Sequence, residues 1–351
     1  MPVTAATAVA VAFGFDVAFG EPPTRVHPVA LFGWLVGRIE RAITSGSNER
    51  AGRKRPAGAL VALVLPLCFA GVAAGVVAAG SHISPWIGAA LAGLTLFSTT
   101  SLRLLLTSAR DVIDATEADL DRARYELRAL AGRDAAGLDA PHVRSAAVES
   151  LAENLADGLV APLAAFTLVA ASAGALTGAG AVAAGSNAVS TSVPLSAAAG
   201  AAAWVKGVNT LDSMLGYRSK PVGWASARLD DIVMWLPARA TALLLAVAGG
   251  SPSLPIRSET RALARQPPSP NSGWPMATMA AALSVRLRKR GTYDLEPGAA
   301  ASSDASDSTK TGDSTGDKSP LPDVAAATRG IRLTQRAGLL AVALAGVVAW
   351  W

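Results

Sequence analysis

Two long apolar runs constrain the fold of this chain more than any other feature. They cover Pro56–Gly80 and Pro85–Leu106, and only the short turn SHIS separates them. A helix needs about 20 mostly apolar residues to cross the hydrocarbon core of a bilayer, and both runs reach that length. Hydrophobic residues make up 51% of the chain and charged residues only 16%, which is unusual for a soluble enzyme. The sequence therefore predicts an all-α, polytopic membrane protein with cytoplasmic helical loops.

Further apolar segments lie on either side of this pair. Gly158–Gly185 and Pro194–Val205 form a second pair, and Ala337–Trp351 ends in two tryptophans that suit a membrane interface. The first segment, Met1–Phe19, lacks the basic N-terminal region of a signal peptide. Asp16 and Glu21 occur where a cleavage site would be expected. We therefore expect it to be a retained apolar helix and not a signal peptide.

The distribution of positive charge predicts the orientation in the membrane. The net charge is +5, and basic residues concentrate between the first and second apolar segments, at Arg38, Arg41, Arg50, Arg53, Lys54 and Arg55. Such loops lie on the cytoplasmic side, so we expect a multi-pass protein of the cell membrane whose main polar segments are cytoplasmic. These basic residues flank membrane segments and lack interleaved aromatic residues, so nucleic acid is not an expected partner.

The segment Ile232–Gly250 does not fit a simple crossing. It contains Pro237 and Arg239, and a full crossing would put the Arg-rich stretch after it outside the cell. We expect a re-entrant or interfacial helix here.

Three polar segments interrupt the apolar ones, over residues 107–157, 206–231 and 251–298. The pattern of residues 107–157 predicts helices, with Gly132 as a stop signal for one of them. We assign all three segments to one membrane domain, residues 1–298. Residues 299–323 are rich in Ser and Asp and predict a disordered linker, followed by a C-terminal membrane helix over 324–351.

Three carboxylates stand directly before the apolar run that begins at Gly158. Glu149, Glu153 and Asp157 are spaced by four residues, so they share one face of a helix, where like charges repel. A Mg²⁺ ion, which prefers oxygen ligands, would remove that repulsion. A solvated acidic face is the more frequent explanation of such spacing.

Two further polar groups lie in the second segment. KGVNTLDSMLGY carries Lys206, Asn209, Asp212, Ser213 and Tyr217, which suit either substrate binding or helix capping at a membrane boundary. WASARLDD carries Arg228, Asp230 and Asp231. Arginine suits bidentate binding of phosphate or carboxylate, although a surface ion pair explains the pattern equally well.

Two turns complete the candidates. SPNSGWP contains Asn271 in a turn whose backbone amides could bind an anion, although a plain loop is commoner. GEPPTRVHP, with the nearby Asp16, holds Glu21, Arg25 and His27, and a structural role is favoured for a histidine beside proline.

Several familiar kinds of site are excluded. The single cysteine, Cys68, and three scattered histidines provide neither a disulfide framework nor a local zinc motif. Neither a Walker A loop nor a dinucleotide-binding glycine loop occurs, so any ATP chemistry must use a different site.

Four segments, in this order, closely resemble the CobD/CbiB family of cobalamin-biosynthesis membrane proteins, the adenosylcobinamide-phosphate synthases. They are DVAFGEPPTRVHPVALFGWLVGRIER, AGRDAAGLDAPHVRSAAVESLAENLADGLVAPL, KGVNTLDSMLGYRSKPVGWASARLDD and SPNSGWPMATMAAALSVRL. The resemblance covers the chain from about Asp16 to Tyr293. One departure is Met276, which stands where many members of the family have an acidic residue.

The resemblance implies an ATP- and Mg²⁺-dependent ligase. It would join adenosylcobyric acid to (R)-1-amino-2-propanol or its O-phosphate through one amide bond, giving adenosylcobinamide or its phosphate. The positions carried over are Glu149, Glu153, Asn154, Asp157, Asn209, Asp212, Ser213, Tyr217, Arg228, Asp231 and Asn271, to which we add Lys206.

Each carried-over position receives an expected role. Glu149, Glu153 and Asp157 are expected to be Mg²⁺ ligands or a general base, with Asp212 facing them. Arg228 and Lys206 would bind phosphate, and the asparagines would orient substrate amides. Ser213, Tyr217 and Asp231 are expected among the substrate-binding residues.

Two other classes of function compete with the enzyme. A corrinoid transporter would place ionisable residues near the middle of the bilayer, whereas the polar groups here gather beside the apolar runs. A scaffold or anchor for soluble enzymes would not need several polar clusters. The lipid bilayer is an expected partner, and a complex with other late cobalamin-pathway enzymes is left open.

Overall fold

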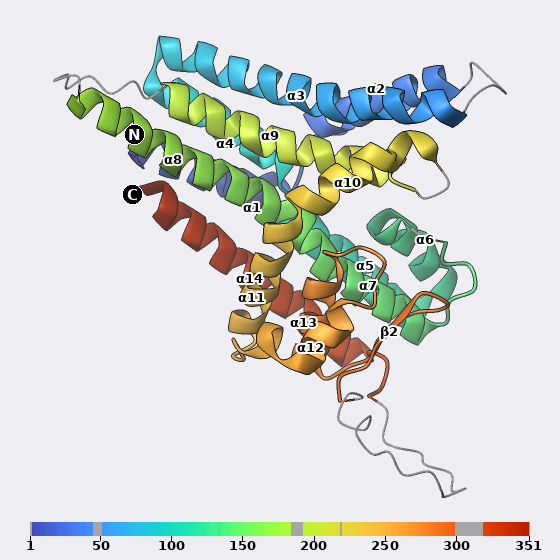
Figure 1. Ribbon diagram of the computed structural model, residues 1–351. Helices are drawn as coiled ribbons and strands as arrows, with labels where there is room; N and C mark the ends of the chain where they lie inside the picture. Colours follow the sequence, from blue (N-terminus) through green and yellow to red (C-terminus); the bar gives the residue numbers. More distant parts are fainter. Residues whose placement is uncertain are drawn as a thin grey trace, which may run out of the picture. The chain divides into compact units, whose positions relative to one another are not determined.

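The computed structural model describes residues 2–44, 51–132, 134–183, 192–217, 220–298 and 319–350. These residues are almost entirely helical, with one two-stranded hairpin, as the all-α prediction requires (Figure 1). Of the predicted linker 299–323, residues 299–318 lie outside the described residues. The long helices are α1 (Pro2–Phe19), α2 (Pro28–Thr44), α3 (Ala51–Ile83), α4 (Pro85–Thr99), α5 (Leu102–Ala118), α6 (Leu120–Ala131), α7 (Ala140–Leu155), α8 (Ala161–Ala183), α9 (Ser192–Leu215), α10 (Trp224–Val233), α11 (Trp235–Ala248), α13 (Gly273–Leu283) and α14 (Val324–Trp350).

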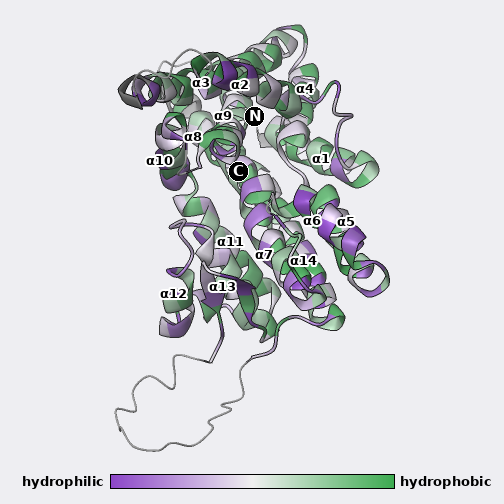
Figure 2. Cartoon of the chain, turned by 90° about the vertical axis from the view of Figure 1, so that its right-hand side faces the viewer, coloured by the Kyte–Doolittle hydropathy of each residue, from purple (hydrophilic) through white to green (hydrophobic). Residues whose placement is uncertain are grey.

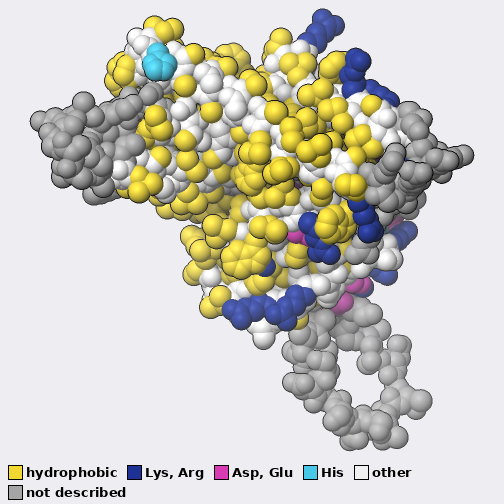
Figure 3. Space-filling view, turned by 45° about the horizontal axis from the view of Figure 1, so that its top comes forward, with side chains coloured by type: hydrophobic (Ala, Val, Ile, Leu, Met, Phe, Trp, Pro, Cys, Tyr) yellow, Lys and Arg dark blue, Asp and Glu magenta, His cyan; other side chains and the backbone are white. Residues whose placement is uncertain are grey.

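Four continuous helical stretches are long and apolar enough to cross a membrane. They cover Lys54–Ile83, Pro85–Ala118, Ala140–Leu176 and Val324–Trp350, so the structure contains the long apolar helices that the sequence predicts. In Figure 3 hydrophobic side chains occupy much of the visible surface, as expected for helix faces that meet lipid.

The segment Ile232–Gly250, which does not fit a simple membrane crossing, lies in a bent helix pair. Residues Pro221–Val233 and Trp235–Ala248 meet at an angle of 47°, which fits either a broken crossing or a re-entrant loop. The re-entrant or interfacial helix therefore stays a prediction.

The chain folds into two compact units. The first comprises Met1–Arg103, Asp157–Pro237 and Ala341–Trp351. Its centre is α9, which packs against α3, α8, α4, α2 and α10 (Figure 1). Because these neighbours contact α9 on several sides, Asn209 is buried inside a helical cluster.

Glycines allow α9 and the turn after it to pack very closely against α3. A methyl group at Gly200 would lie 3.2 Å from the carbonyl oxygen of Ala70. At Gly58, on α3, a methyl group would lie only 1.9 Å from the carbonyl oxygen of Val222, in the short 3₁₀ turn η2 (Pro221–Gly223). Small residues at helix interfaces let backbones approach in this way. The contact at Gly58 holds the start of α10 beside α3.

Two side chains cap each other's helices where α1 ends and α5 begins. The Asp16 carboxylate accepts hydrogen bonds from the backbone amides of Leu102 and Arg103, at 3.1 Å each. In return, Arg103 Nη1 donates to the carbonyl oxygens of Val17, at 2.5 Å, and Ala18, at 2.9 Å. A carboxylate suits the positive end of a helix and a cation the negative end. This exchange holds the start of the GEPPTRVHP loop beside the break between α4 and α5.

The second unit comprises Leu104–Ala156 and Ala238–Leu340. It contains α6, α7 and α13, the short helix α12 (Ser258–Ala264), and strands β1 (Leu287–Lys289) and β2 (Tyr293–Leu295), which pair antiparallel. Hydrophilic residues are prominent on α5, α6 and α12 (Figure 2). The helices predicted within residues 107–157 are present, and Gly132 ends α6 in the left-handed conformation with φ 60°.

Residues at the end of the predicted linker are held by the second unit. The backbone amide of Arg286 donates to the carbonyl oxygen of Pro320, at 2.9 Å, and Arg144 Nε donates to the carbonyl oxygen of Pro322, also at 2.9 Å. These contacts precede α14 and fix where that helix begins.

The close contact at Gly58 generates a prediction. Gly58→Ala should destabilise the protein by about 1–3 kcal/mol, because the new methyl group overpacks a backbone-to-backbone contact. Gly71→Ala on the same helix is the matched control, since no atom lies within 4 Å of the position that its methyl group would take. Thermal unfolding in detergent compares the two. Equal melting temperatures for both variants would contradict the packing described here.

Candidate active site

Three polar residues follow the apolar half of α9. Lys206, Asn209 and Asp212 are spaced by three residues, so they occupy adjacent turns of the helix. Asn209 is 8% exposed, and the other two are half-buried. The preceding residues Ala198–Ala203 are small and apolar, which lets neighbouring helices approach. The sequence thus places a charged and amide-bearing helix end inside the first unit.

Asp157 joins this cluster from an irregular turn. It lies in η1 (Ala156–Val160), a π-helical turn that separates α7 from α8. Such turns insert a residue into a helix and frequently occur at functional sites. Asp157 hydrogen-bonds to Asn209, and it interacts electrostatically with Lys206 and Asp212.

Two adjacent aspartates of α10 complete the acidic part of the cluster. Asp230 also hydrogen-bonds to Asn209 and interacts electrostatically with Asp157 and Asp212. Its Oδ1 atom is buried and has no hydrogen-bond partner among the described residues. Asp231 lies 3.8 Å from the guanidinium of Arg228. A carboxylate oxygen that is buried without a partner is costly, so a ligand that satisfied Asp230 would be stabilised there.

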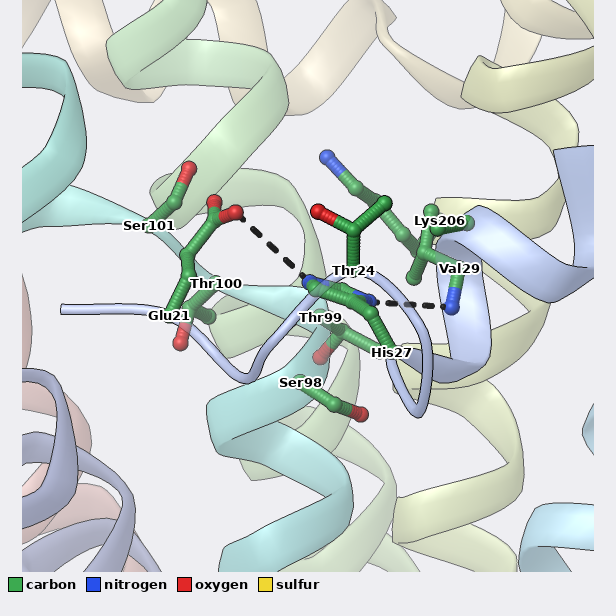
Figure 4. A pocket seen from close by; sticks show the side chains of 10 residues that line it. Glu21, Thr24, His27, Val29, Ser98, Thr99, Thr100, Ser101 and Lys206 are labelled. Carbon is green, nitrogen blue, oxygen red and sulfur yellow. Dashed lines mark hydrogen bonds and ion pairs between the residues drawn. The ribbon is translucent and has the colours of Figure 1, made fainter. Parts of the chain in front are cut away.

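A cavity of about 270 Å³ opens beside Lys206 in the same unit (Figure 4). One wall is the loop between α1 and α2, with Glu21, Thr24 and His27. The opposite wall is the break between α4 and α5, with the hydroxyl residues Ser98, Thr99, Thr100 and Ser101. The lining therefore combines a carboxylate, an ammonium group, an imidazole and several hydroxyl groups.

Hydrogen bonds define the state of His27. Its Nδ1 atom accepts a hydrogen bond from the backbone amide of Val29, at 3.2 Å, and so caps α2. Its Nε2 atom lies 3.7 Å from the Glu21 carboxylate (Figure 4). Because Nδ1 is an acceptor, the proton of a neutral imidazole lies on Nε2 and points toward Glu21.

The surroundings shift the pKa values of both Glu21 and His27. Burial raises the pKa of Glu21, although the Lys206 charge and a hydrogen bond from Ser101 oppose this effect. Burial, helped by the positive charge of Lys206, lowers the pKa of His27. The pair therefore combines a carboxylate that takes up a proton more readily than usual with an imidazole that stays neutral.

The other expected residues of the first unit lie nearer the surface. Ser213 is exposed, and its hydroxyl group donates to the carbonyl oxygen of Asn209, at 2.9 Å. Tyr217 is 53% exposed and its ring contacts Lys220. Arg228 is exposed apart from its interaction with Asp231. Substrate binding by these three residues stays a prediction.

Four expected residues belong to the second unit, because the boundary between the units falls between Ala156 and Asp157. Glu149 is 3% exposed, and both its oxygens accept hydrogen bonds, one from Ser145 at 2.8 Å and the other from Tyr293 at 2.7 Å. Asn154 donates to the carbonyl oxygen of Leu130 at 3.2 Å, and Glu153 is half-buried on α7.

The fourth, Asn271, is buried, and its side-chain oxygen accepts a hydrogen bond from Arg239 at 3.2 Å. These contacts give Glu149, Asn154 and Asn271 a clear part in packing. Within the described ranges, no three His, Cys, Asp or Glu side chains form a group that could hold a metal ion. The three-carboxylate magnesium site expected from Glu149, Glu153 and Asp157 therefore stays a prediction.

Sequence reasoning misses part of this site. It favours a structural role for Glu21 and His27, and it does not single out the run of hydroxyl residues 98–101. It notes Asp230 only as a partner of Arg228. The one available signal for Glu21 and His27 is the density of ionisable residues in a short Pro-rich loop next to an apolar helix.

Comparisons with known proteins give a consistent result. Residues 9–315 match the family described as CobD/Cbib protein. The cobalamin biosynthesis protein CobD of Mycobacterium tuberculosis is 39% identical over 295 residues, which is 81% of this chain and 80% of the relative. The protein of the same description from Geobacter metallireducens is 36% identical over 290 residues, 80% of this chain and 81% of the relative. The probable cobalamin biosynthesis protein CobD of Methanothrix thermoacetophila is 32% identical over 292 residues, 80% of this chain and 83% of the relative. No solved structure matches the chain.

The lowered pKa of His27 predicts a pH dependence of stability. The unfolded chain binds a proton at His27 near the ordinary value of about 6.5, whereas the folded chain binds it only at lower pH. Stability is therefore present above about pH 6.5 and falls as the pH drops through the interval below it. Asn at position 27 keeps an acceptor for the backbone amide of Val29 but has no imidazole to protonate. The part of the stability loss at low pH that comes from His27 should therefore be absent in His27→Asn.

The measurement is the difference in melting temperature between wild type and His27→Asn, in detergent, from about pH 8 to pH 5.5. Taking the difference removes the opposite effect of Glu21, whose raised pKa favours proton uptake by the folded state. A difference that does not change over this range would show that the folded state takes up the His27 proton normally.

Proposed function

The chain belongs to the CobD/Cbib protein family, which gives it a role in cobalamin biosynthesis, and we propose that it is the ligase that forms one amide bond in that process. The substrates are adenosylcobyric acid, ATP and (R)-1-amino-2-propanol or its O-phosphate. The product is adenosylcobinamide or its phosphate. The observation that best supports this proposal is the polar cluster around Asn209, which lies among apolar helices and combines carboxylates with a lysine.

An amide bond does not form from a free carboxylate at a useful rate, so the carboxylate needs activation. The terminal phosphoryl group of ATP is transferred to an oxygen of the corrinoid carboxylate, and ADP leaves. The donor ammonium then loses a proton, its nitrogen attacks the acyl carbon, and inorganic phosphate leaves as the second proton is released. Phosphoryl transfer depends mainly on positioning and charge stabilisation, which a cluster of fixed polar groups can provide.

Asp157 and Asp230 suit a magnesium ion that is bound together with ATP. Mg²⁺ is commonly held by one or two carboxylates with substrate phosphates and waters. Both carboxylates hydrogen-bond to Asn209, and Asp230 Oδ1 has no partner among the described residues. When bound, Mg²⁺ neutralises charge on the phosphate oxygens. Participation of Glu149 and Glu153 in metal binding rests on the family resemblance and not on the geometry.

The remaining residues of the cluster have separate roles. Lys206 places a positive charge where phosphate charge accumulates, and Asn209 fixes the two carboxylates. Asp212 lies within electrostatic reach of Asp157 and Asp231. The concentration of basic residues from the end of α2 to the start of α3 supports a cytoplasmic location for the active site, where ATP is present.

The proposal predicts that purified protein in nanodiscs will couple its substrates. With adenosylcobyric acid, ATP, Mg²⁺ and either donor, the corrinoid should gain the mass of one donor less one water. Asp157→Asn and Asp230→Asn should lower kcat by about 10²–10³-fold, as expected for the loss of a group that stabilises developing charge. Asp114→Asn, an exposed aspartate on α5, is the control and should keep full activity.

Corrinoid binding without a new product, with a working reference enzyme in the same assay, would contradict the ligase and favour a carrier or scaffold. Full activity in both site variants would leave the ligase standing and remove this cluster from its active site.

A further inference from the structure

The short helix α12 carries three exposed arginines on one side. Arg257, Arg261 and Arg265 follow one another at four-residue spacing, from the residue before the helix to the residue after it, and form what we call the arginine stripe. Leu263 and Ala264 of the same helix are buried, and α12 packs against α13 (Figure 2 shows α12 as a hydrophilic helix). The packing against α13 therefore leaves the stripe open to the surroundings.

The arginine stripe has no acidic partner. In the described part of the chain none of its three side chains forms an ion pair, and Arg257 makes only a long hydrogen bond, at 3.5 Å, to the hydroxyl group of Ser253. The hairpin, whose strand β2 contacts α12, differs in this respect, since its Arg290 lies 3.1 Å from Asp139. Like charges at four-residue spacing repel, so a bound anion would stabilise the stripe.

An exposed apolar face precedes the stripe along the chain. On α11, Leu243 is 51% exposed and Val247 is 47% exposed, and their spacing puts them on one side of the helix. Ile256, in the 3₁₀ turn η3 (Leu254–Ile256), is 66% exposed and stands directly before Arg257. Apolar side chains followed by basic ones are typical of a segment at the boundary between membrane and water.

Consecutive turns connect this apolar face to the stripe. The backbone amide of Ser251 donates to the carbonyl oxygen of Ala246, at 2.8 Å, and that of Leu254 donates to Ser251, at 3.0 Å. The amide of Arg257 in turn donates to the carbonyl oxygen of Leu254, at 3.2 Å. The chain therefore passes from the apolar helix to the stripe through turns and not through an extended linker.

We propose that the arginine stripe of α12 binds the anionic headgroups of bilayer phospholipids, while the exposed apolar residues of α11 and η3 contact the acyl chains. A guanidinium group binds phosphate through two parallel hydrogen bonds, and three in a row match a surface of many phosphates. An acidic protein would match the charge but not the apolar residues beside it. The contact agrees with the interfacial helix predicted for Ile232–Gly250, because the stripe follows directly after that segment.

Lipid binding by the full chain tests this proposal. The protein in detergent is titrated with phosphatidylglycerol, which is anionic, or with phosphatidylcholine, which is not, and native mass spectrometry measures the bound fraction. Wild type should prefer phosphatidylglycerol. Each single change of a stripe arginine to Gln should weaken this binding by about fivefold, and the triple change by about 10²-fold, because each basic residue near an anionic surface contributes separately. The triple change to Lys, which keeps the charge, should retain most of the preference.

The matched control removes the same charge from arginines that already pair with acids. In Arg122→Gln/Arg288→Gln/Arg290→Gln the lost ion pairs measure 2.7, 3.5 and 3.1 Å. This variant should bind phosphatidylglycerol like wild type. Thermal unfolding without lipid establishes that each variant is folded, and the three single changes test the stripe if the triple variant does not fold.

Three results would overturn the proposal. One is unchanged phosphatidylglycerol binding in the triple Gln variant of the stripe, or an equal loss in the matched control. Another is displacement of the lipid by an equal concentration of inorganic phosphate, which would make the stripe a site for free phosphate. The third is tighter binding of a synthetic peptide of residues 299–318 than of phosphatidylglycerol, which would make the stripe a site for an acidic segment. None of these readouts involves amide formation, so the proposed ligase is tested separately.

Discussion

The structure of the first unit depends on one physical constraint: ionisable side chains among apolar helices are stable only when other polar groups surround them. Lys206 follows the apolar half of α9 and is packed among apolar helices, where an isolated ammonium would be costly. Asp157 and Glu21 reach it electrostatically from two different parts of the chain. The same requirement brings Asn209 to Asp157 and Asp230. Once α9 carries these residues, the π turn, the first loop and α10 have to supply partners at its side.

The backbone features around the cluster serve this arrangement. The π turn places Asp157 at the start of α8, and the glycine contact at Gly58 holds the turn that leads into α10. Asp16 and Arg103 fix the first loop beside the break between α4 and α5. These elements place both the acidic residues and a small mixed-charge cavity beside Lys206. The proposed ligase would need both features, since it binds a nucleotide and a small amine.

The helical membrane fold is predictable from the sequence, because the length of an uncharged run is a direct signal. The grouping of Lys206, Asn209 and Asp212 is also predictable, since one helix carries all three. The position of Glu21 and His27 beside Lys206 is not, because it depends on how α1, α2, α4 and α9 pack across long sequence separations. The spacing of Glu149, Glu153 and Asp157 correctly indicates helical structure. However, spacing cannot reveal that both oxygens of Glu149 accept hydrogen bonds from Ser145 and Tyr293.

The most direct test of the chemistry is an isotope-transfer measurement. Adenosylcobyric acid is labelled with ¹⁸O in its free carboxylate and is converted with ATP and the amine donor, and the phosphorus products are analysed by mass. Activation as an acyl phosphate requires one labelled oxygen to leave the corrinoid in inorganic phosphate. Label in AMP would instead show activation as an adenylate. Amide formation with no label in any phosphorus product would contradict phosphoryl activation of the carboxylate altogether.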